Sequence, residues 1–141
     1  EPLLKEKIVV ALPGAHPYCG REAVALRELR EEGFILCREG FHLRTLTLDA
    51  CKAAGFTPRI AVSGTDIDTA LRFVRSGLGV TLVPAIALEG ARGIGAVPLT
   101  DPPLERTVGI AWNPHRYLSR AATAMREYLR GALGRGGAPE V

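Results

Sequence analysis

Short apolar runs recur along the chain, and most are bounded by glycine, proline or charged residues. Runs of four to six residues that are rich in Val, Ile and Leu predict buried β-strands. The predicted strands are Ile8 to Leu12, Gly33 to Cys37, Arg59 to Val62, Gly79 to Pro84 and Thr107 to Trp112.

Between these runs, apolar residues recur at intervals of three and four positions, which predicts amphipathic helices. The segments are a short helix or helical turn within Glu22 to Glu32, a helix over Leu43 to Ala54 and a last helix over Ser119 to Leu133. A further helix starts after Thr65, which we expect to be its capping residue, and ends before Gly77. Strands and helices therefore alternate, as in α/β folds with a mostly parallel sheet.

The rest of the chain has a less regular pattern. The stretch Glu89 to Pro103 is rich in glycine and proline, and no helix or strand is assigned to it. The last helix carries a continuous apolar stripe that requires a partner surface, made of Leu118, Ala122, Met125, Leu129 and Leu133. The tail, residues 134 to 141, is expected to be disordered.

Composition narrows the class of protein. The chain has 141 residues, 47% of them hydrophobic, which suits one globular domain with a single core. The net charge of +3 gives no strong electrostatic footprint for nucleic acid, so direct DNA binding by this segment is not expected. No apolar run approaches the roughly 20 residues of a membrane span, and no export signal is recognised, so a cytoplasmic location is expected.

The order of these features resembles the effector-binding region of LysR-type transcriptional regulators. The resemblance covers the chain from about Leu3 to Leu133 and is carried by a series of segments. They are Ile8 to Pro17, Phe34 to Leu36 with its glycine-containing loop, Ala53 to Ile60, Val74 to Pro84, and Arg106 to Trp112 followed by the last helix.

The resemblance implies one lobe of a type II periplasmic-binding-protein-like fold, with a Rossmann-like, mostly parallel sheet and two crossing hinge strands. It implies a first crossing strand in residues 1–14, the second lobe in 15–103, and the return strand with the last helix in 104–133. Most of the first lobe and the winged helix-turn-helix of the family would then be missing from this chain. DNA contact is accordingly expected only through the missing N-terminal domain.

Ligands of open α/β sheets bind where strands end and the following helices begin. Two such places occur, after Cys37 and after Val62, and by resemblance both face a cleft between the lobes. The candidate ligand-binding residues are Arg38, Gly40, Phe41, His42, Arg44, Ser63, Gly64 and Thr65. Free helix amides with the two arginines favour an anionic or carboxylate-bearing effector, although Asp66 and Asp68 oppose this in part.

Each candidate also has a purely structural interpretation. Ser63 and Thr65 suit helix capping as well as ligand binding, and the two roles are compatible. His42 could lie in a solvated loop, and Phe41 could cover an edge of the core rather than a ligand.

The three cysteines, Cys19, Cys37 and Cys51, form neither a disulfide framework nor a metal-binding pattern. In the peroxide-sensing branch of the family, one cysteine precedes the long helix and a second lies within it. Cys51 resembles the second, whereas His42 fills the place of the first, so a disulfide switch of that kind is not supported. Burial as a small hydrophobic residue is the favoured interpretation of Cys51 and Cys37.

The sequence is compatible with three functions. The leading hypothesis is an effector-sensing domain within a homo-oligomer. The alternatives are a solute-binding lobe of a transport-type protein and a thiol-based redox sensor. No enzyme activity, metal or cofactor is predicted, because His16, His42 and His115 lie far apart in the sequence and no catalytic motif occurs.

Overall fold

The structure is a computed structural model that describes residues 1–133. The expected disorder of residues 134–141 concerns residues outside this range. The chain divides into two compact units. We call Ile8–Leu104 the main unit, and residues 1–7 together with the chain from Glu105 onward the small unit.

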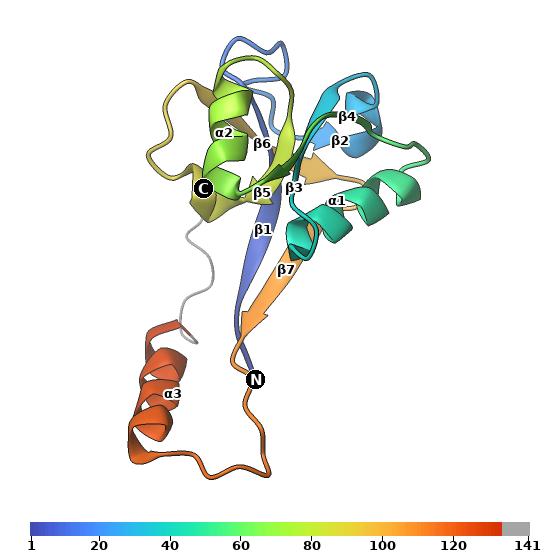
Figure 1. Ribbon diagram of the computed structural model, residues 1–141. Helices are drawn as coiled ribbons and strands as arrows, with labels where there is room; N and C mark the ends of the chain where they lie inside the picture. Colours follow the sequence, from blue (N-terminus) through green and yellow to red (C-terminus); the bar gives the residue numbers. More distant parts are fainter. Residues whose placement is uncertain (134–141) are drawn as a thin grey trace. The chain divides into compact units, whose positions relative to one another are not determined.

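The helices and strands follow one another in the order drawn in Figure 1. The strands are β1 (Pro2–Pro13), β2 (Val24–Ala25), β3 (Gly33–Cys37), β4 (Arg59–Thr65), β5 (Thr81–Pro84), β6 (Ile94–Thr100) and β7 (Leu104–Gly109). The α-helices are α1 (His42–Ala53), α2 (Ile67–Arg75) and α3 (Arg120–Leu133), and the 3-10 helices are η1 (Leu26–Leu29) and η2 (Ala85–Leu88).

The sheet of the main unit has the strand order β4-β3-β5-β1-β6-β2. β3 pairs with β4 in parallel, and a parallel bridge between Phe34 and Val80 joins β3 to β5, supported by a bond from Ile35 N–H to the Val80 carbonyl at 2.8 Å. β1 is antiparallel to both β5 and β6, and β2 is parallel to β6. Every strand of this order except β1 therefore runs in the same direction, which confirms the predicted mostly parallel α/β sheet.

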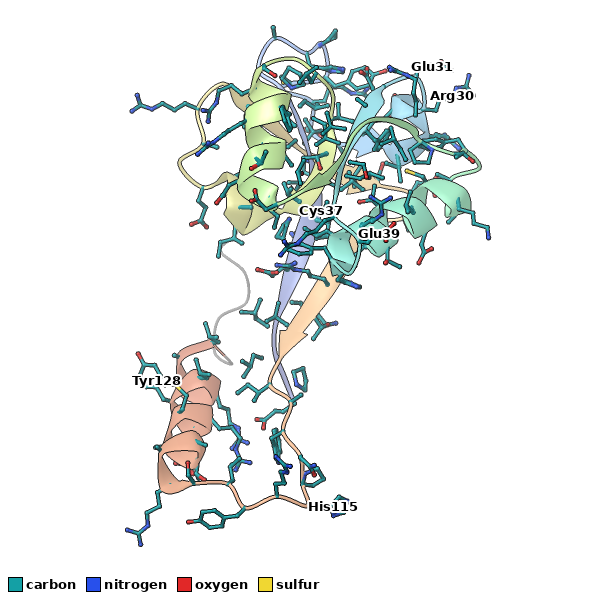
Figure 2. The ribbon with its side chains drawn as sticks, in the orientation of Figure 1. Arg30, Glu31, Cys37, Glu39, His115 and Tyr128 are labelled. Carbon is teal, nitrogen blue, oxygen red and sulfur yellow. The ribbon has the colours of Figure 1, made fainter. Side chains whose placement is uncertain are left out.

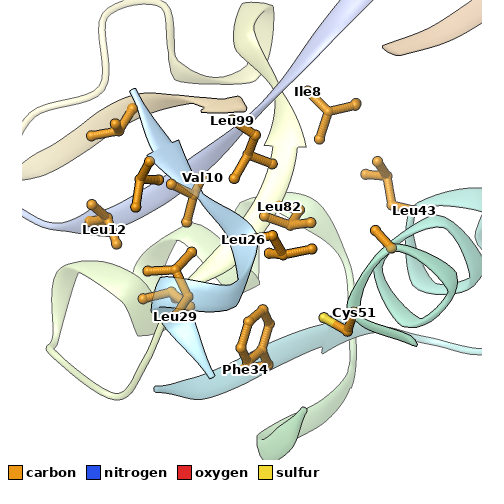
Figure 3. Packing of buried hydrophobic residues seen from close by; sticks show 14 of the residues in the cluster. Ile8, Val10, Leu12, Leu26, Leu29, Phe34, Leu43, Cys51, Leu82 and Leu99 are labelled. Carbon is orange, nitrogen blue, oxygen red and sulfur yellow. The ribbon is translucent and has the colours of Figure 1, made fainter. Parts of the chain in front are cut away.

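Alternate side chains of β1 enter two separate cores, because neighbouring residues of a strand point to opposite faces of the sheet. Ile8, Val10 and Leu12 pack with η1 and α1 on one face, around the buried Phe34 (Figure 3). Val9 and Ala11 pack on the other face with α2. Burial on both faces explains why this part of the strand is an uninterrupted apolar run.

Helices α1 and α2 end as the sequence predicts. Gly55 and Gly77 follow the two helices in the left-handed region, with φ of 89° and 83°. The amide after each glycine bonds back into the last turn: Phe56 N–H to the Cys51 carbonyl, and Leu78 N–H to the Phe73 carbonyl, both at 3.1 Å. These are the bonds of a Schellman motif, which explains the positions of both glycines.

Gly79 allows the chain just before β5 to approach the first residue of β3 closely. A Cβ atom at this position would lie 2.2 Å from the carbonyl oxygen of Gly33. In the structure, Val80 N–H donates to that same oxygen at 2.8 Å. Only glycine at position 79 leaves the bond undisturbed.

Several predicted elements differ from the structure. Within Glu22 to Glu32, the expected short helix or helical turn is the 3-10 helix η1, which the two-residue β2 precedes, and Val24, Leu26 and Leu29 are buried. The glycine- and proline-rich stretch Glu89 to Pro103, to which no strand was assigned, contains β6, which pairs with β1. The strand expected over Thr107 to Trp112 lies earlier, as β7, and the first strand is longer than expected.

The small unit contains α3 and the loop that precedes it. The Ser119 hydroxyl accepts a bond from Ala122 N–H at 3.2 Å, which caps the helix where the sequence predicts its start. No side chain within Arg120–Leu133 is buried, and Met125 and Tyr128 are 59% and 71% exposed. Of the predicted apolar stripe, Ala122 and Met125 are exposed, and Leu118, Leu129 and Leu133 are half-buried.

Candidate functional site

The two predicted ligand-binding segments are neighbours in the structure. β3 and β4 end side by side, with Cys37 opposite Thr65 in the parallel register. Beyond this pair, Arg38 N–H donates to the Thr65 carbonyl at 3.0 Å. Figure 2 shows Cys37 and Glu39 at this end of β3, next to the first turn of α1. The loop that begins α1 and the end of β4 therefore form one edge of the sheet, which we call the carboxyl edge.

Two glycines shape this edge. Gly40 and Gly64 have φ values of 85° and 91°, which L side chains rarely adopt. Gly40 turns the chain from β3 into α1, and Gly64 lies in β4 between two hydroxyl-bearing residues. Both predicted glycines are thus explained by their backbone conformation. A Cβ atom at either position would meet nothing within 4 Å.

Arg44 joins the three elements that meet at the carboxyl edge. It lies in the first turn of α1, and its Nη1 donates to the Cys37 carbonyl at 3.0 Å and to the Ser63 hydroxyl at 2.7 Å. A planar guanidinium has five N–H donors, so these two bonds leave further donors for another acceptor. The side chain is partly buried, and its position is defined by the ends of both strands.

The expected helix cap at Thr65 is wrong. Asp66 is the N-cap of α2: its carboxylate accepts a bond from Thr69 N–H at 2.7 Å, and its backbone is extended. Thr69 N–H, as the main cause, and the positive charges of Arg38 and Arg72 lower the pKa of the Asp66 carboxyl below its usual value. A carboxylate is an equally good cap, and Thr65 is still paired as the last residue of β4.

The Thr65 hydroxyl is left without a partner. Thr65 is only 9% exposed, and its Oγ1 is buried with no hydrogen bond to any residue in the described chain. A hydroxyl in this condition costs about 1–3 kcal/mol relative to a satisfied one. Such groups are rare in folded proteins, so this one requires an explanation.

The remaining candidates lie around the same turn with different surroundings. The guanidinium of Arg38 stacks on the ring of Phe41, 4.7 Å from its centroid. Phe41 also packs against the main core, which agrees with its role as a cover for the core edge. His42 is exposed at the first position of α1.

A third segment reaches the carboxyl edge and was not singled out from the sequence. β5 runs parallel to β3 and ends at Pro84, so η2 begins at the same edge. Ile86 in η2 is 57% exposed, which is high for a large apolar side chain. The apolar run that ends at Pro84 could have indicated this third segment, just as the runs that end at Cys37 and Val62 indicated the other two.

Two of the three cysteines, Cys37 and Cys51, have surroundings that oppose thiolate chemistry. All three are free thiols. Burial raises the pKa of Cys51 to about 11. Burial, and then the negative charge of Asp66, raises the pKa of Cys37. The reactive form of a cysteine is the thiolate, so both thiols are poor nucleophiles near neutral pH.

The histidines, groups that could hold a metal and helices that could cross a membrane were the other features to consider in the described residues. Of the three histidines, His16 bonds to Glu32 at 2.9 Å, His42 lies in α1 and His115 lies in the loop before α3. Among residues 1–133, no group of three or more His, Cys, Asp or Glu side chains is placed to hold a metal ion. Within the same residues, no helix has the length and apolar character that crossing a membrane requires.

Curated relatives extend well beyond this chain. The transcriptional dual regulator GltC of Bacillus subtilis is 37% identical over 129 residues, which are 90% of this chain and 43% of the relative. The chain therefore spans less than half the length of that protein.

Solved structures share the fold. The C-terminal domain of a probable LysR family transcriptional regulator from Rhodococcus sp. RHA1 has a TM-score of 0.80 at 30% identity, covering 92% of this chain and 65% of that one. The CcmR regulatory domain of Synechocystis PCC6803, in complex with 2-PG, has a TM-score of 0.89 at 20% identity, covering 98% and 68%, which shows the fold alone. A family model described as the LysR substrate binding domain matches residues 1–134. The chain therefore belongs to the LysR substrate binding domain family.

Proposed function

We propose that this chain is the effector-sensing part of a LysR-type transcriptional regulator and binds a small molecule at the carboxyl edge. The binding residues would be those of the turn into α1, Arg38 to Arg44, and of the end of β4, Ser63 to Thr65. The observation that carries the proposal is the buried Thr65 hydroxyl, which has no partner in the described chain. A bound ligand would supply the missing hydrogen bond.

The chemistry of the edge favours an anionic or carboxylate-bearing effector. Arg38 and Arg44 bring two positive charges to the loop, and α1 begins there without a side-chain cap and without an acidic residue in its first turn. Charge-assisted hydrogen bonds from arginine to carboxylate are among the strongest in proteins. The CcmR regulatory domain, which has the same fold, is found in complex with 2-PG, and this agrees with small-molecule binding by the present chain.

In this proposal, effector binding shifts the balance between arrangements of a larger protein. The DNA would be contacted by a part of the regulator outside this chain, in the cytoplasm. The segments around β1 and β7 would serve as the two crossing strands between lobes, with the second lobe in residues 15–103. No catalytic step is involved.

We also propose that the regulator is a homo-oligomer. Met125 and Tyr128 on α3 are highly exposed, and exposed apolar side chains of this size favour association. Static light scattering of the 141-residue chain tests this proposal. A dimer or larger assembly is expected, and a monomer at high concentration would contradict it.

A thermal-shift screen of the chain against small metabolites identifies the compound that raises the melting temperature most. Calorimetric titration with that compound then tests the effector site. The Ser63→Ala, Thr65→Ala double variant is expected to stay folded and to lose affinity for that compound. Thr57→Ala, at an exposed position outside the edge, is the matched control. Equal affinity of the double variant and the control would disprove this site.

A further inference from the structure

The loop that follows β1 folds back through a series of tight turns (Figure 1). His16 N–H donates to the Pro13 carbonyl at 2.9 Å, and Cys19 N–H donates to the His16 carbonyl at 3.0 Å. Tyr18 and Cys19 pack against the main core and are partly buried. We call residues 14–21 the strap, because this segment covers part of the core between β1 and β2.

The imidazole ring of His16 uses both of its nitrogens within the main unit. Nδ1 accepts a hydrogen bond from Tyr18 N–H at 3.1 Å, and Nε2 lies 2.9 Å from a carboxylate oxygen of Glu32. The His16 side chain is 12% exposed, and the ring of Tyr18 meets it edge-on, with the ring centroids 5.1 Å apart. His16 therefore fastens the strap to the segment between η1 and β3.

These two partners determine where the proton of the neutral ring lies. A backbone N–H is only a donor, so Nδ1 must offer a lone pair to Tyr18 and carries no proton. The single proton is then on Nε2, from which it donates to the Glu32 carboxylate. The neutral ring thus satisfies both contacts in one tautomer. The other tautomer would place two donors against each other at Tyr18.

A second proton on the ring disturbs only one of the two contacts. In imidazolium both nitrogens are donors, so Nδ1–H would point at Tyr18 N–H and that bond would be lost. At Nε2 the bond to Glu32 remains and becomes an ion pair. The other charged groups nearby are Arg21, which stacks on the Tyr18 ring at 4.6 Å, and Glu28, which forms an ion pair with Arg21. Their charges oppose each other, so Glu32 is the charge that acts on the ring most directly.

We propose that His16 is a pH-sensitive latch for the strap. In its neutral form, the ring holds the Tyr18 amide and the Glu32 carboxylate together. Uptake of a proton releases the Tyr18 amide, while the ring stays attached to Glu32. The latch is separate from the effector site, because β1 is antiparallel to β5 and the strap therefore leaves the sheet at the end opposite to the carboxyl edge.

A pH titration of the 141-residue chain by NMR tests the latch. Long-range proton–nitrogen spectra report which nitrogen of the His16 ring carries a proton, and the Tyr18 amide signal reports its hydrogen bond. His16→Asn is the test variant, because the Asn side-chain oxygen can accept from the amide two residues later but does not titrate. His115→Asn is the matched control, because His115 is exposed in the loop before α3 (Figure 2). Glu32→Gln controls for titration of the carboxylate.

Above neutral pH, the His16 ring is expected to carry its proton on Nε2 alone. As the ring takes up its second proton, the Tyr18 amide signal should shift in step with it. The protection of this amide against hydrogen exchange, corrected for the intrinsic rate, should fall by about fivefold or more, because one hydrogen bond is lost. A response of the same kind is expected in His115→Asn and Glu32→Gln, whereas Tyr18 should keep its protection throughout in His16→Asn.

Several results would overturn the proposal. One is a neutral His16 ring with its proton on Nδ1, and another is a Tyr18 amide that does not respond when the ring is protonated. A ring that stays neutral until the chain unfolds in acid would also contradict the latch. A response that persists in His16→Asn, or that disappears in Glu32→Gln, would assign the titration to another group. If a variant fails to fold, the ring and amide signals of the wild type decide the matter.

Discussion

Arg38 N–H donates to the carbonyl of Thr65 at 3.0 Å, while the hydroxyl of the same threonine lies buried without a partner in the described chain. The backbone bond fixes the end of β4 to the turn that begins α1. The side chain is thereby held in place although it gains no hydrogen bond. Polar groups that are kept at a cost to stability are typical of functional sites.

Replacing Thr65 with valine is expected to stabilise the ligand-free chain. Valine has nearly the same shape and removes the unsatisfied hydroxyl, so the free energy of unfolding should rise by about 1 kcal/mol. Urea unfolding measures the change, with Thr57→Val as the exposed control. A lower stability of Thr65→Val than of the control would mean that the hydroxyl is satisfied in solution.

Two glycine-to-alanine substitutions are expected to change stability in opposite directions. Alanine at Gly79 places its Cβ against the Gly33 carbonyl and forces the backbone of β3 or β5 to move, at a cost of about 1–3 kcal/mol. Gly131 lies within α3 with open space around it, so alanine there should stabilise the helix by about 1 kcal/mol. Thermal unfolding of both variants tests the pair, and a neutral Gly79→Ala would show that the two strands are not so close.

The charge of Asp66 is expected to make stability depend on pH. Its pKa is lower in the folded chain than the usual value, so its stabilising effect is complete above the unfolded pKa and is lost as the pH falls through the folded pKa. Asp66→Asn keeps a capping acceptor and removes the charge. The variant should be less stable than the wild type at neutral pH, with the gap closing in acid. A gap that stays constant down to strongly acidic pH would contradict this role.

The buried thiols are expected to react slowly. With its pKa raised to about 11, Cys51 has very little thiolate at neutral pH, and Cys37 is shifted in the same direction. Mass spectrometry after mild peroxide should therefore find Cys51 and Cys37 reduced, and both should react with iodoacetamide once the chain is unfolded. Selective oxidation of Cys51 in the folded chain would revive the redox-sensor hypothesis.

The parts of the fold that the sequence predicts well are those in which local pattern and burial agree. β3, α1 and α2 each have an apolar pattern of the right period and a glycine or a charged loop at their ends. For the site, parallel strands place their carboxyl ends together, so the proximity of the turn after Cys37 to Ser63, Gly64 and Thr65 was predictable, although these three residues belong to β4 itself rather than to a loop after Val62. The resemblance to the LysR family was also visible in the order of these segments, and the family match confirms it.

The errors arise where pairing with a distant strand outweighs the local pattern. β6 contains Pro98, which normally argues against a central strand. It is accepted there because β2 pairs only with Leu99 and Thr100, so Pro98 has a neighbouring strand on one side alone. β7 starts at Leu104, before the apolar run, and its Arg106 forms an ion pair with Glu6 of β1.

The details of the site could not be predicted from the sequence for a similar reason. Thr65 and Asp66 are adjacent, and both are good caps, so composition alone does not choose between them. The choice depends on how far β4 stays paired with β3, which extends to Thr65. The bonds from Arg44 to Cys37 and Ser63 likewise span elements that no local pattern connects.

A crystal structure of the chain with the metabolite that raises its melting temperature most would test the effector site directly. The metabolite is expected to lie at the carboxyl edge, with an oxygen within hydrogen-bonding distance of the Thr65 hydroxyl and its anionic group beside Arg44. A metabolite bound elsewhere, with the Thr65 hydroxyl occupied by an ordered water, would contradict the account.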